Sequence, residues 1–219
     1  VIYPPSLVPA FQKDIPIKIL NTFQAENQGT TISRNFAQKN HSITGISSID
    51  DIALVNLQGN GMIGVAGVSA KLFGILAENK ISVILISQAS SEHSICFAID
   101  PKSSEKVKGI LEEGFKTEIL NGDIENINIQ QNLSIIAVVG EGMKSTSGTS
   151  GKLFSVLGKN GINVVATAQG SSELNISVVI RKKDISKALN AIHETFFEVD
   201  GFTLHLFLVG PSGLIGKTL

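Results

Sequence analysis

Residues 52–99 read IALVNLQGNGMIGVAGVSAKLFGILAENKISVILISQASSEHSICFAI, and residues 133–180 read LSIIAVVGEGMKSTSGTSGKLFSVLGKNGINVVATAQGSSELNISVVI. The two stretches align without a gap at a constant shift of 81 residues, and 18 of the 48 aligned positions are identical. An internal repeat constrains the fold before any other pattern does. The identities include polar loop residues: Gln88 matches Gln169, and Ser-Ser-Glu follows two residues later in both copies. Shared packing explains a repeated Leu, whereas a repeated Gln and Ser-Ser-Glu indicate shared chemistry.

The first copy predicts the order strand, helix, strand, strand, helix, strand. Strands are expected at 52–57, 81–87, 94–99 and 124–129, and helices after the glycine-rich turn 59–67 and over 101–114. The first helix rests on the amphipathic spacing of Val68, Leu72 and Leu76, and Asp100 is expected to cap the second. Residues 88–93 are too few for a helical crossover, so the strands on either side should form an antiparallel hairpin. This order is that of a ferredoxin-like α+β unit.

The second copy repeats this order but lacks a fourth strand. Its strands are expected at 133–139, 162–168 and 174–181, and its helices at 148–160 and 184–197. The strand candidate 42–49 has no other partner in the sequence. We hypothesise that it fills the vacant fourth position, so that the first unit is inserted within the second.

The sequence outside the repeats is less regular. A short helix is expected at 6–12, a strand at 15–20, and a loop or linker at 21–40, which is polar and rich in Gly and Asn. Residues 202–209 predict a strand that leads into another glycine-rich turn. The chain begins at Val1 without Met and ends at Leu219, within what the pattern predicts as the start of a helix. We therefore expect a fragment of a longer polypeptide.

The composition limits the class of protein. The chain has 219 residues, of which 42% are hydrophobic and 17% charged, with a net charge of −1, which indicates a globular protein with a substantial core. The near-zero charge provides no electrostatic surface for nucleic acid or an anionic membrane, and no apolar run approaches the ~18 residues of a membrane span. The single cysteine, Cys96, excludes an internal disulfide, and no signal peptide is evident, so a cytoplasmic location is expected.

The turn Gly59-x-Gly61-x-x-Gly64 matches a dinucleotide-binding fingerprint when it is taken in isolation. Its context argues against that function. The second copy has Ser145 in place of the third glycine, the next strand ends in Gln rather than in an acidic residue, and the next connection is a hairpin. A turn of this kind instead exposes backbone N–H groups at a helix N-terminus, where an anion is favoured.

We interpret each glycine turn, together with the glutamine that ends the next strand, as a site for a free amino acid. The turn suits an α-carboxylate, and the amide of Gln88 or Gln169 suits an α-ammonium or a hydroxyl. The alternative is a plain tight turn with Gln as a polar strand terminus. The presence of Gln and of Ser-Ser-Glu in both copies favours the amino-acid site over this alternative. The four histidines have no metal-ligand spacing, Cys96 lies in an apolar strand, and no nucleophile–base arrangement is defensible, so neither a metal site nor catalysis is predicted.

Tandem units with amino-acid-site features resemble the ACT regulatory domains. The N-terminal segment resembles the end of an aspartokinase catalytic domain. The resemblance rests on Val1-Ile2-Tyr3-Pro4-Pro5-Ser6-Leu7 through Ile15-Pro16-Ile17, on Asn21-Thr22-Phe23 and on Gly29-Thr30. The family usually has His-Pro-Arg in place of Tyr3-Pro4-Pro5. Met62, QASSE at 88–92 and QGSSE at 169–173 resemble the regulatory region of bifunctional aspartokinase–homoserine dehydrogenases. The tail 202–219 lies where the first Rossmann strand of the dehydrogenase begins.

The resemblance implies a division of the chain. Residues 1–40 would be the end of the kinase domain plus a linker, 41–51 the strand that completes the second ACT unit, 52–132 the first ACT unit, 133–201 the second, and 202–219 the start of the dehydrogenase domain. The turn with Gly210, Gly213 and Gly216 has Ser212 and Ile215 in place of two fingerprint glycines, so no complete cofactor site is expected. ATP and Mg²⁺ would serve the parent kinase and NAD(P) the parent dehydrogenase, and the fragment itself would not be an enzyme.

The resemblance further implies feedback inhibition by threonine, the end product of the pathway, and a homodimer formed through the ACT units, whose strand edges are unprotected. The family's threonine contacts carry over to Gln88 and Gln169, the two turns would supply backbone contacts, and residues of the following strands would line the ligand. The full set is Met62, Gly67, Val68, Ser82, Val83, Gln88, Ser90, Met143, Gly148, Thr149, Asn163, Val164, Gln169 and Ser171.

Threonine is favoured over lysine because lysine-sensitive relatives place Asp after the Ser-Val pair, where this chain has Ile84 and, in the second copy, Val165. A buried ammonium facing Ile would lack a partner, at a cost of at least a few kcal/mol. The alternatives are a lysine-binding regulatory region and an oligomerisation module with vestigial sites.

Overall fold

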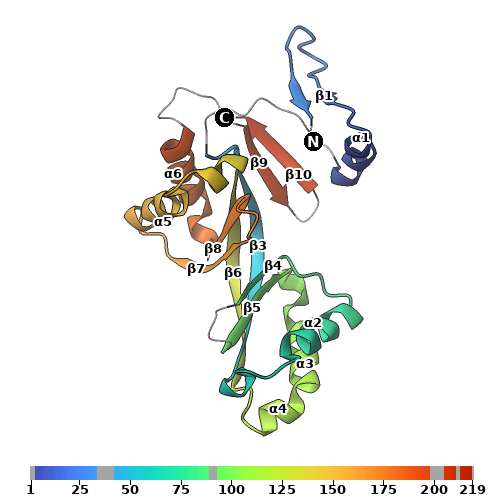
Figure 1. Cartoon of the computed structure of the whole chain (residues 1–219), viewed down its shortest axis with the longest axis vertical. Helices are drawn as coiled ribbons and strands as arrows, with labels where there is room; N and C mark the ends of the chain where they lie inside the picture. Colours follow the sequence, from blue (N-terminus) through green and yellow to red (C-terminus); the bar gives the residue numbers. More distant parts are fainter. Residues whose placement is uncertain (1–2, 34–41, 89–92, 198–204, 211–212, 219) are drawn as a thin grey trace.

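The computed structural model describes residues 3–33, 42–88, 93–197, 205–210 and 213–218. Two long antiparallel strands, β3 (Gly45–Gln58) and β6 (Asn126–Val139), run through both of its α/β units (Figure 1). Residues 45–49 of β3 pair with 135–139 of β6, and residues 54–58 pair with 126–130. Each long strand therefore contributes one half to each unit.

The first unit has the strand order β4-β5-β3-β6 and carries its helices on one face (Figure 1). Its remaining elements are η2 (Asn60–Met62), α2 (Val68–Glu78), β4 (Leu85–Gln88), β5 (Ser94–Ile99), η3 (Pro101–Ser103), α3 (Ser104–Gly114) and α4 (Lys116–Leu120). The apolar stripes of α2 and α3 are buried against Phe97, as their spacing predicts. The carboxylate of Asp100 accepts a hydrogen bond from the Lys102 amide, so the predicted cap is confirmed.

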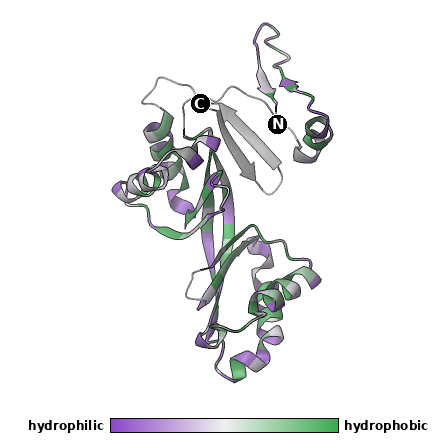
Figure 2. Cartoon of the chain, viewed as in Figure 1, coloured by the Kyte–Doolittle hydropathy of each residue, from purple (hydrophilic) through white to green (hydrophobic). Residues whose placement is uncertain are grey.

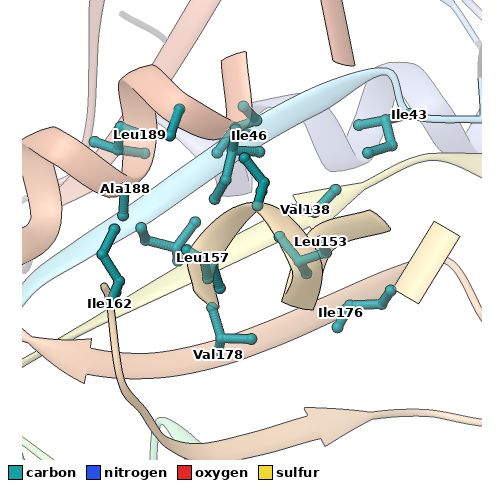
Figure 3. Packing of buried hydrophobic residues seen from close by; sticks show 14 of the residues in the cluster. Ile43, Ile46, Val138, Leu153, Leu157, Ile162, Ile176, Val178, Ala188 and Leu189 are labelled. Atoms are coloured by element: carbon teal, nitrogen blue, oxygen red, sulfur yellow. The ribbon is translucent and has the colours of Figure 1, made fainter. Parts of the chain in front are cut away.

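The second unit repeats this arrangement in the order β3-β6-β8-β7. Its elements are η4 (Glu141–Ser145), α5 (Thr149–Lys159), β7 (Val164–Gln169), β8 (Asn175–Arg181), η5 (Lys182–Asp184) and α6 (Ile185–Phe197). Figure 3 shows Ile43 and Ile46 beside Val138 and Leu153 in the core of this unit. The first half of β3 thus pairs with β6 within this unit and lines its core. Both predicted hairpins, β4–β5 and β7–β8, are antiparallel.

Two glycines mark equivalent close contacts in the two units. A Cβ atom added to Gly59 would lie 2.1 Å from the carbonyl oxygen of Asp123, and one added to Gly140 would lie 2.3 Å from that of Ser42. Asp123 and Ser42 are themselves 81 positions apart. The chain before β3 therefore packs on the second unit as the chain before β6 packs on the first.

The strands bend where they pass from one unit to the other. Asp51 and Asn132, again 81 positions apart, have φ values of 64° and 58°, and the β3–β6 register shifts beside them. Asp and Asn tolerate this left-handed conformation better than other side chains do. The bend places the helix-free faces of the two units against each other. A third core of strand residues forms there: Ile52, Leu54, Leu85, Ala98, Leu133, Ile135 and Val179.

Several sequence predictions are wrong in detail. The strand candidates 42–49 and 52–57 form one strand, as do 124–129 and 133–139, because the left-handed residue lets pairing continue beyond the bulge. β4 begins at Leu85 rather than at 81, since Ile81 and Val83 pack against the core of the first unit before pairing starts. The helix α4 was not predicted.

The flanking segments also differ from expectation. The N-terminal segment contains η1 (Pro4–Leu7), α1 (Val8–Gln12), β1 (Ile17–Ile19) and β2 (Thr30–Ile32). β2 lies in the segment predicted as a loop, because pairing with β1 is a long-range contact. At the other end β9 (His205–Gly210) pairs with β10 (Gly213–Thr218), so the helix predicted to start there is wrong. Only two residues join these strands, and a connection of that length favours a hairpin.

Hydrophobic and hydrophilic residues both occur along the helices in Figure 2, as expected for helices that cover one face of a sheet. Among the described residues, no helix has the length and apolar character needed to span a membrane.

Candidate functional site

A groove of about 440 Å³ lies between the two units, where β4 approaches β7. Gln88 at the end of β4 and Gln169 at the end of β7 both line it, although they belong to different copies of the repeat. The Ser87 hydroxyl donates a hydrogen bond of 2.7 Å to the Thr167 carbonyl oxygen and so connects the two strands. The complete lining is Ile84, Leu85, Ile86, Ser87, Gln88, Thr167, Ala168, Gln169, Gly170, Asn175 and Ser177.

The duplicated sequence gives the two glutamines matching positions. Gln88 lies opposite Ile95 of β5, and Gln169 lies opposite Ile176 of β8. Both isoleucines are buried, whereas both glutamines are exposed. Within the described part of the chain, β4 pairs only with β5 and β7 only with β8, so both glutamines end strands with one open edge.

The groove offers neutral hydrogen-bonding groups. Three side-chain amides, those of Gln88, Gln169 and Asn175, and several hydroxyls line it, and the described lining residues include no charged side chain. Amides both donate and accept, so such a lining can bind carboxylate, ammonium and hydroxyl groups of a small polar ligand. It offers no partner for a charged ligand side chain.

The glycine turn of the first unit lies around a different cavity. Met62, Gly67 and Val68 line a space of about 330 Å³ that shares no lining residue with the groove. The structure therefore brings the two predicted glutamines together but separates both from this turn within one chain.

The other predicted residues are distributed over both units. Met143 and Thr149 are buried, and the Thr149 hydroxyl donates to the Thr146 carbonyl oxygen at 3.1 Å. Gly148 precedes α5 with φ of 88°. Ser82, Asn163 and Ser171 are exposed, whereas Val83 and Val164 pack against the cores of their units. Ser90 lies outside the described residues.

Sequence reasoning missed the charged residues of the second cavity. The Lys71 ammonium forms an ion pair of 2.5 Å with Glu118 and lies 4.8 Å from the centre of the Phe115 ring. The hydrogen bond from Lys71 holds the pKa of Glu118 below its usual value, while partial burial opposes that shift. Asp123 borders the same cavity. The sequence held one indication that position 71 matters, because both copies of the repeat have lysine there, Lys71 and Lys152.

This ion pair predicts a pH dependence of stability. The pKa of Glu118 is lower in the folded chain than in the unfolded chain. The ion pair therefore stabilises the fold fully at pH values above the unfolded-state pKa of Glu118. This stabilisation is lost as the pH falls through the folded-state pKa. Lys71→Met keeps the contact with Phe115 but removes the charge. We expect it to lower the free energy of unfolding at pH 7 by about 0.2–1 kcal/mol, since both side chains are partly exposed. In urea titrations the difference from the unsubstituted chain should vanish at a pH below the folded pKa of Glu118, which itself lies below the ordinary value; a difference that stays constant with pH would contradict the assignment.

Cys96 is half-buried in β5, and its thiol donates to the Asn56 side-chain oxygen at 3.1 Å. Burial raises the pKa of this thiol. Cys96 packs against the core of strand residues between the two units. Gly210, Gly213 and Gly216 lie in β9 and β10 rather than between a strand and a helix.

The ACT domain model matches residues 55–115 and 136–196 of this sequence, one match for each unit. The chain belongs to the ACT domain family. The expected pair of ferredoxin-like ACT units is thereby confirmed. The bounds expected for the flanking kinase and dehydrogenase segments stay a prediction.

Similar proteins point to one group of enzymes. A chloroplastic bifunctional aspartokinase/homoserine dehydrogenase of Arabidopsis thaliana is 41% identical over 224 residues, which cover all of this ACT chain and 24% of the relative. The chain therefore spans about a quarter of the length of that relative. Among solved structures, Clostridium acetobutylicum aspartate kinase has a TM-score of 0.76 at 28% identity, with 87% of this chain and 44% of that chain covered. The ligand-free regulatory subunit of Thermus thermophilus aspartate kinase has a TM-score of 0.60 at 27% identity, with 70% and 99% covered.

Proposed function

We propose that this chain is the regulatory region of an aspartokinase fused to a homoserine dehydrogenase, and that it binds threonine as a feedback inhibitor. Two observations support the region: bifunctional relatives match along its whole length, and a separate regulatory subunit has the same fold. In this proposal ATP, Mg²⁺ and NAD(P) serve the flanking catalytic domains, the ACT units form a homodimer, and the location is cytoplasmic or, as in the Arabidopsis relative, chloroplastic.

The lining of the groove is the main reason for proposing threonine rather than lysine as the ligand. Its described side chains are neutral, and the position at which lysine-sensitive relatives have Asp is Ile84. The amides of Gln88 and Gln169 bind the ammonium, carboxylate or hydroxyl of threonine, and a lysine ε-ammonium would find no anionic partner there. Ser171 and Ser90, close to the glutamines in sequence, complete the proposed contacts.

Calorimetric titration of the 219-residue chain tests this function. We expect Gln88→Ala and Gln169→Ala each to weaken threonine binding by about 10-fold or more, because a hydrogen bond to a charged group contributes about 1.5–3 kcal/mol. Gln130→Ala, at an exposed position of β6 outside the groove, is the matched control and should leave binding unchanged.

Three results would contradict the proposal. Absence of threonine binding to the unsubstituted chain would favour an oligomerisation module with vestigial sites. Unchanged affinity in both glutamine variants would place threonine elsewhere. Lysine binding that is tighter than threonine binding, and that depends on the same glutamines, would assign the groove to lysine.

A further inference from the structure

We infer that the second unit binds an internal water molecule beside the bend, between the hydroxyl groups of Ser48 in β3 and Ser134 in β6. Both serines are buried, with exposed fractions of 2% and 0%. Neither hydroxyl has a hydrogen-bond partner within the described chain. A buried hydroxyl without a partner is unfavourable, because folding removes the hydrogen bonds that it makes to solvent in the unfolded chain. One bound water molecule supplies a partner to both serines at once.

The two hydroxyl groups lie on the same face of the sheet. Ser48 follows Ile46 by two residues along β3, and the Ile46 side chain belongs to the core of the second unit (Figure 3). Ser48 pairs with Ile136, and Ser134 pairs with Ile180 of β8; both isoleucines belong to that core as well. Ser134 is therefore the diagonal neighbour of Ser48, with the two Cβ atoms no more than about 7–8 Å apart. A water molecule that binds both hydroxyls spans a separation of this size.

The bulge in β3 provides further polar groups at the same place. The register of the β3–β6 ladder shifts between Ile49 and Ile52, so that residues 50–51 lie opposite Ser134 alone. A bulge leaves backbone groups without their ladder partners. Internal water molecules typically form about three hydrogen bonds. The two hydroxyls and one backbone group of the bulge give the water this number of partners.

Comparison of the two units separates this site from the requirements of the fold. At the shift of 81 the counterparts of Ser134 and Ser48 are Ala53 and Ile129, and both pack in the core of the first unit. The same two positions thus accept purely apolar side chains. The two serines together have one side-chain heavy atom fewer than Ala53 and Ile129. The substitution therefore adds two hydrogen-bonding groups and leaves space for about one further heavy atom, as a water molecule requires.

The surroundings favour a small neutral ligand. The core residues around the two serines are apolar, and an ion placed among them would lose its hydration without a charged partner. The site shares no residue with the groove between the units, so it is independent of the proposed threonine binding.

A high-resolution crystal structure of the 219-residue chain tests the site directly. We expect one ordered water oxygen within about 3 Å of both serine hydroxyl oxygens. Two results would overturn the inference: serine hydroxyls bonded to each other or to the backbone, or serine hydroxyls with no water between them.

A double-mutant cycle tests the shared water in solution. We expect Ser48→Ala and Ser134→Ala each to increase the equilibrium constant of unfolding by about 5-fold, because each removes one hydrogen bond to the water. The double variant should be no less stable than either single variant, since it leaves no buried hydroxyl unpaired. Without the water, each alanine would remove an unfavourable group. Both single variants would then be more stable than the unsubstituted chain in urea titrations, and that result would refute the site.

The repeat offers a second set of variants. Ser48→Ile combined with Ser134→Ala copies the first unit, and we expect this pair to be at least as stable as the unsubstituted chain. Ser48→Ile alone should be less stable than the pair, because the isoleucine takes the place of the water and leaves the Ser134 hydroxyl unpaired. Ser47→Ala, on the opposite face of β3, is the matched control and should change stability little. Equal stability of Ser48→Ile and the pair would contradict a water shared by the two serines.

Discussion

Replacement of Gly59 or Gly140 by alanine is expected to destabilise its unit by about 1–3 kcal/mol or more, because the added methyl group has no space. At Gly59 the methyl carbon would lie 2.1 Å from the Asp123 carbonyl oxygen and 2.6 Å from the Ile124 Cα. This backbone cannot easily move away, since the Gly61 amide donates to the same carbonyl and the Glu125 amide donates to Gln58. At Gly140 the corresponding contact is 2.3 Å from the Ser42 carbonyl oxygen.

Helical glycines of the same units provide the controls. An added Cβ at Gly74 in α2 or Gly158 in α5 would have no neighbour within 4 Å. Gly→Ala at these positions is expected to be neutral or to stabilise by up to ~1 kcal/mol, because Ala has the higher helix propensity. Urea unfolding of the four variants measures the difference. Equal stability of Gly59→Ala and Gly74→Ala would contradict the close packing of the strand connections.

Ile46→Ala is expected to destabilise the second unit by about 2–5 kcal/mol, although residue 46 precedes the first unit in the sequence. Ile46 is 1% exposed and lies in the core formed with α5 and α6 (Figure 3). Amide hydrogen exchange distinguishes the units. We expect faster exchange in β8 and α6, with α2 and α3 retaining their protection.

The repeat offers a reciprocal substitution. Ile127 is the counterpart of Ile46 at the shift of 81 and packs against the core of the first unit. Ile127→Ala should therefore increase exchange in α2 and α3 and spare β8. The same exchange pattern in both variants would show that the half-strands do not belong to opposite units.

Local periodicity was sufficient to predict most of the elements. The stripe of Val68, Leu72 and Leu76 became the buried face of α2, since a helix that covers a sheet must repeat its apolar residues at that spacing. The short connections between second and third strands predicted both hairpins, because no crossover fits into so few residues. The cap at Asp100 was predictable from one side chain.

Features that depend on distant contacts were not predictable. The continuity of β3 and β6 beyond Asp51 and Asn132 depends on a partner strand that holds the ladder together on both sides of the bulge. The pairing of β2 with β1 likewise arises from residues with no distinctive local pattern. No spacing rule links residue 71 to residue 118, so the sequence contained no pattern that predicts their ion pair. The repeated lysine was the one indication of the charged cavity.

The sequence by itself determined that there are two ACT units, which elements each contains, and that Gln88 and Gln169 are equivalent polar positions, because these properties follow from short-range spacing and from the repeat at 81. Only the tertiary structure decided that the two glutamines share one groove while the turn after β3 borders another cavity. The physical reason is the bend at the two left-handed residues. It brings the helix-free faces of the units together to bury their apolar strand residues, and this packing sets β4 beside β7.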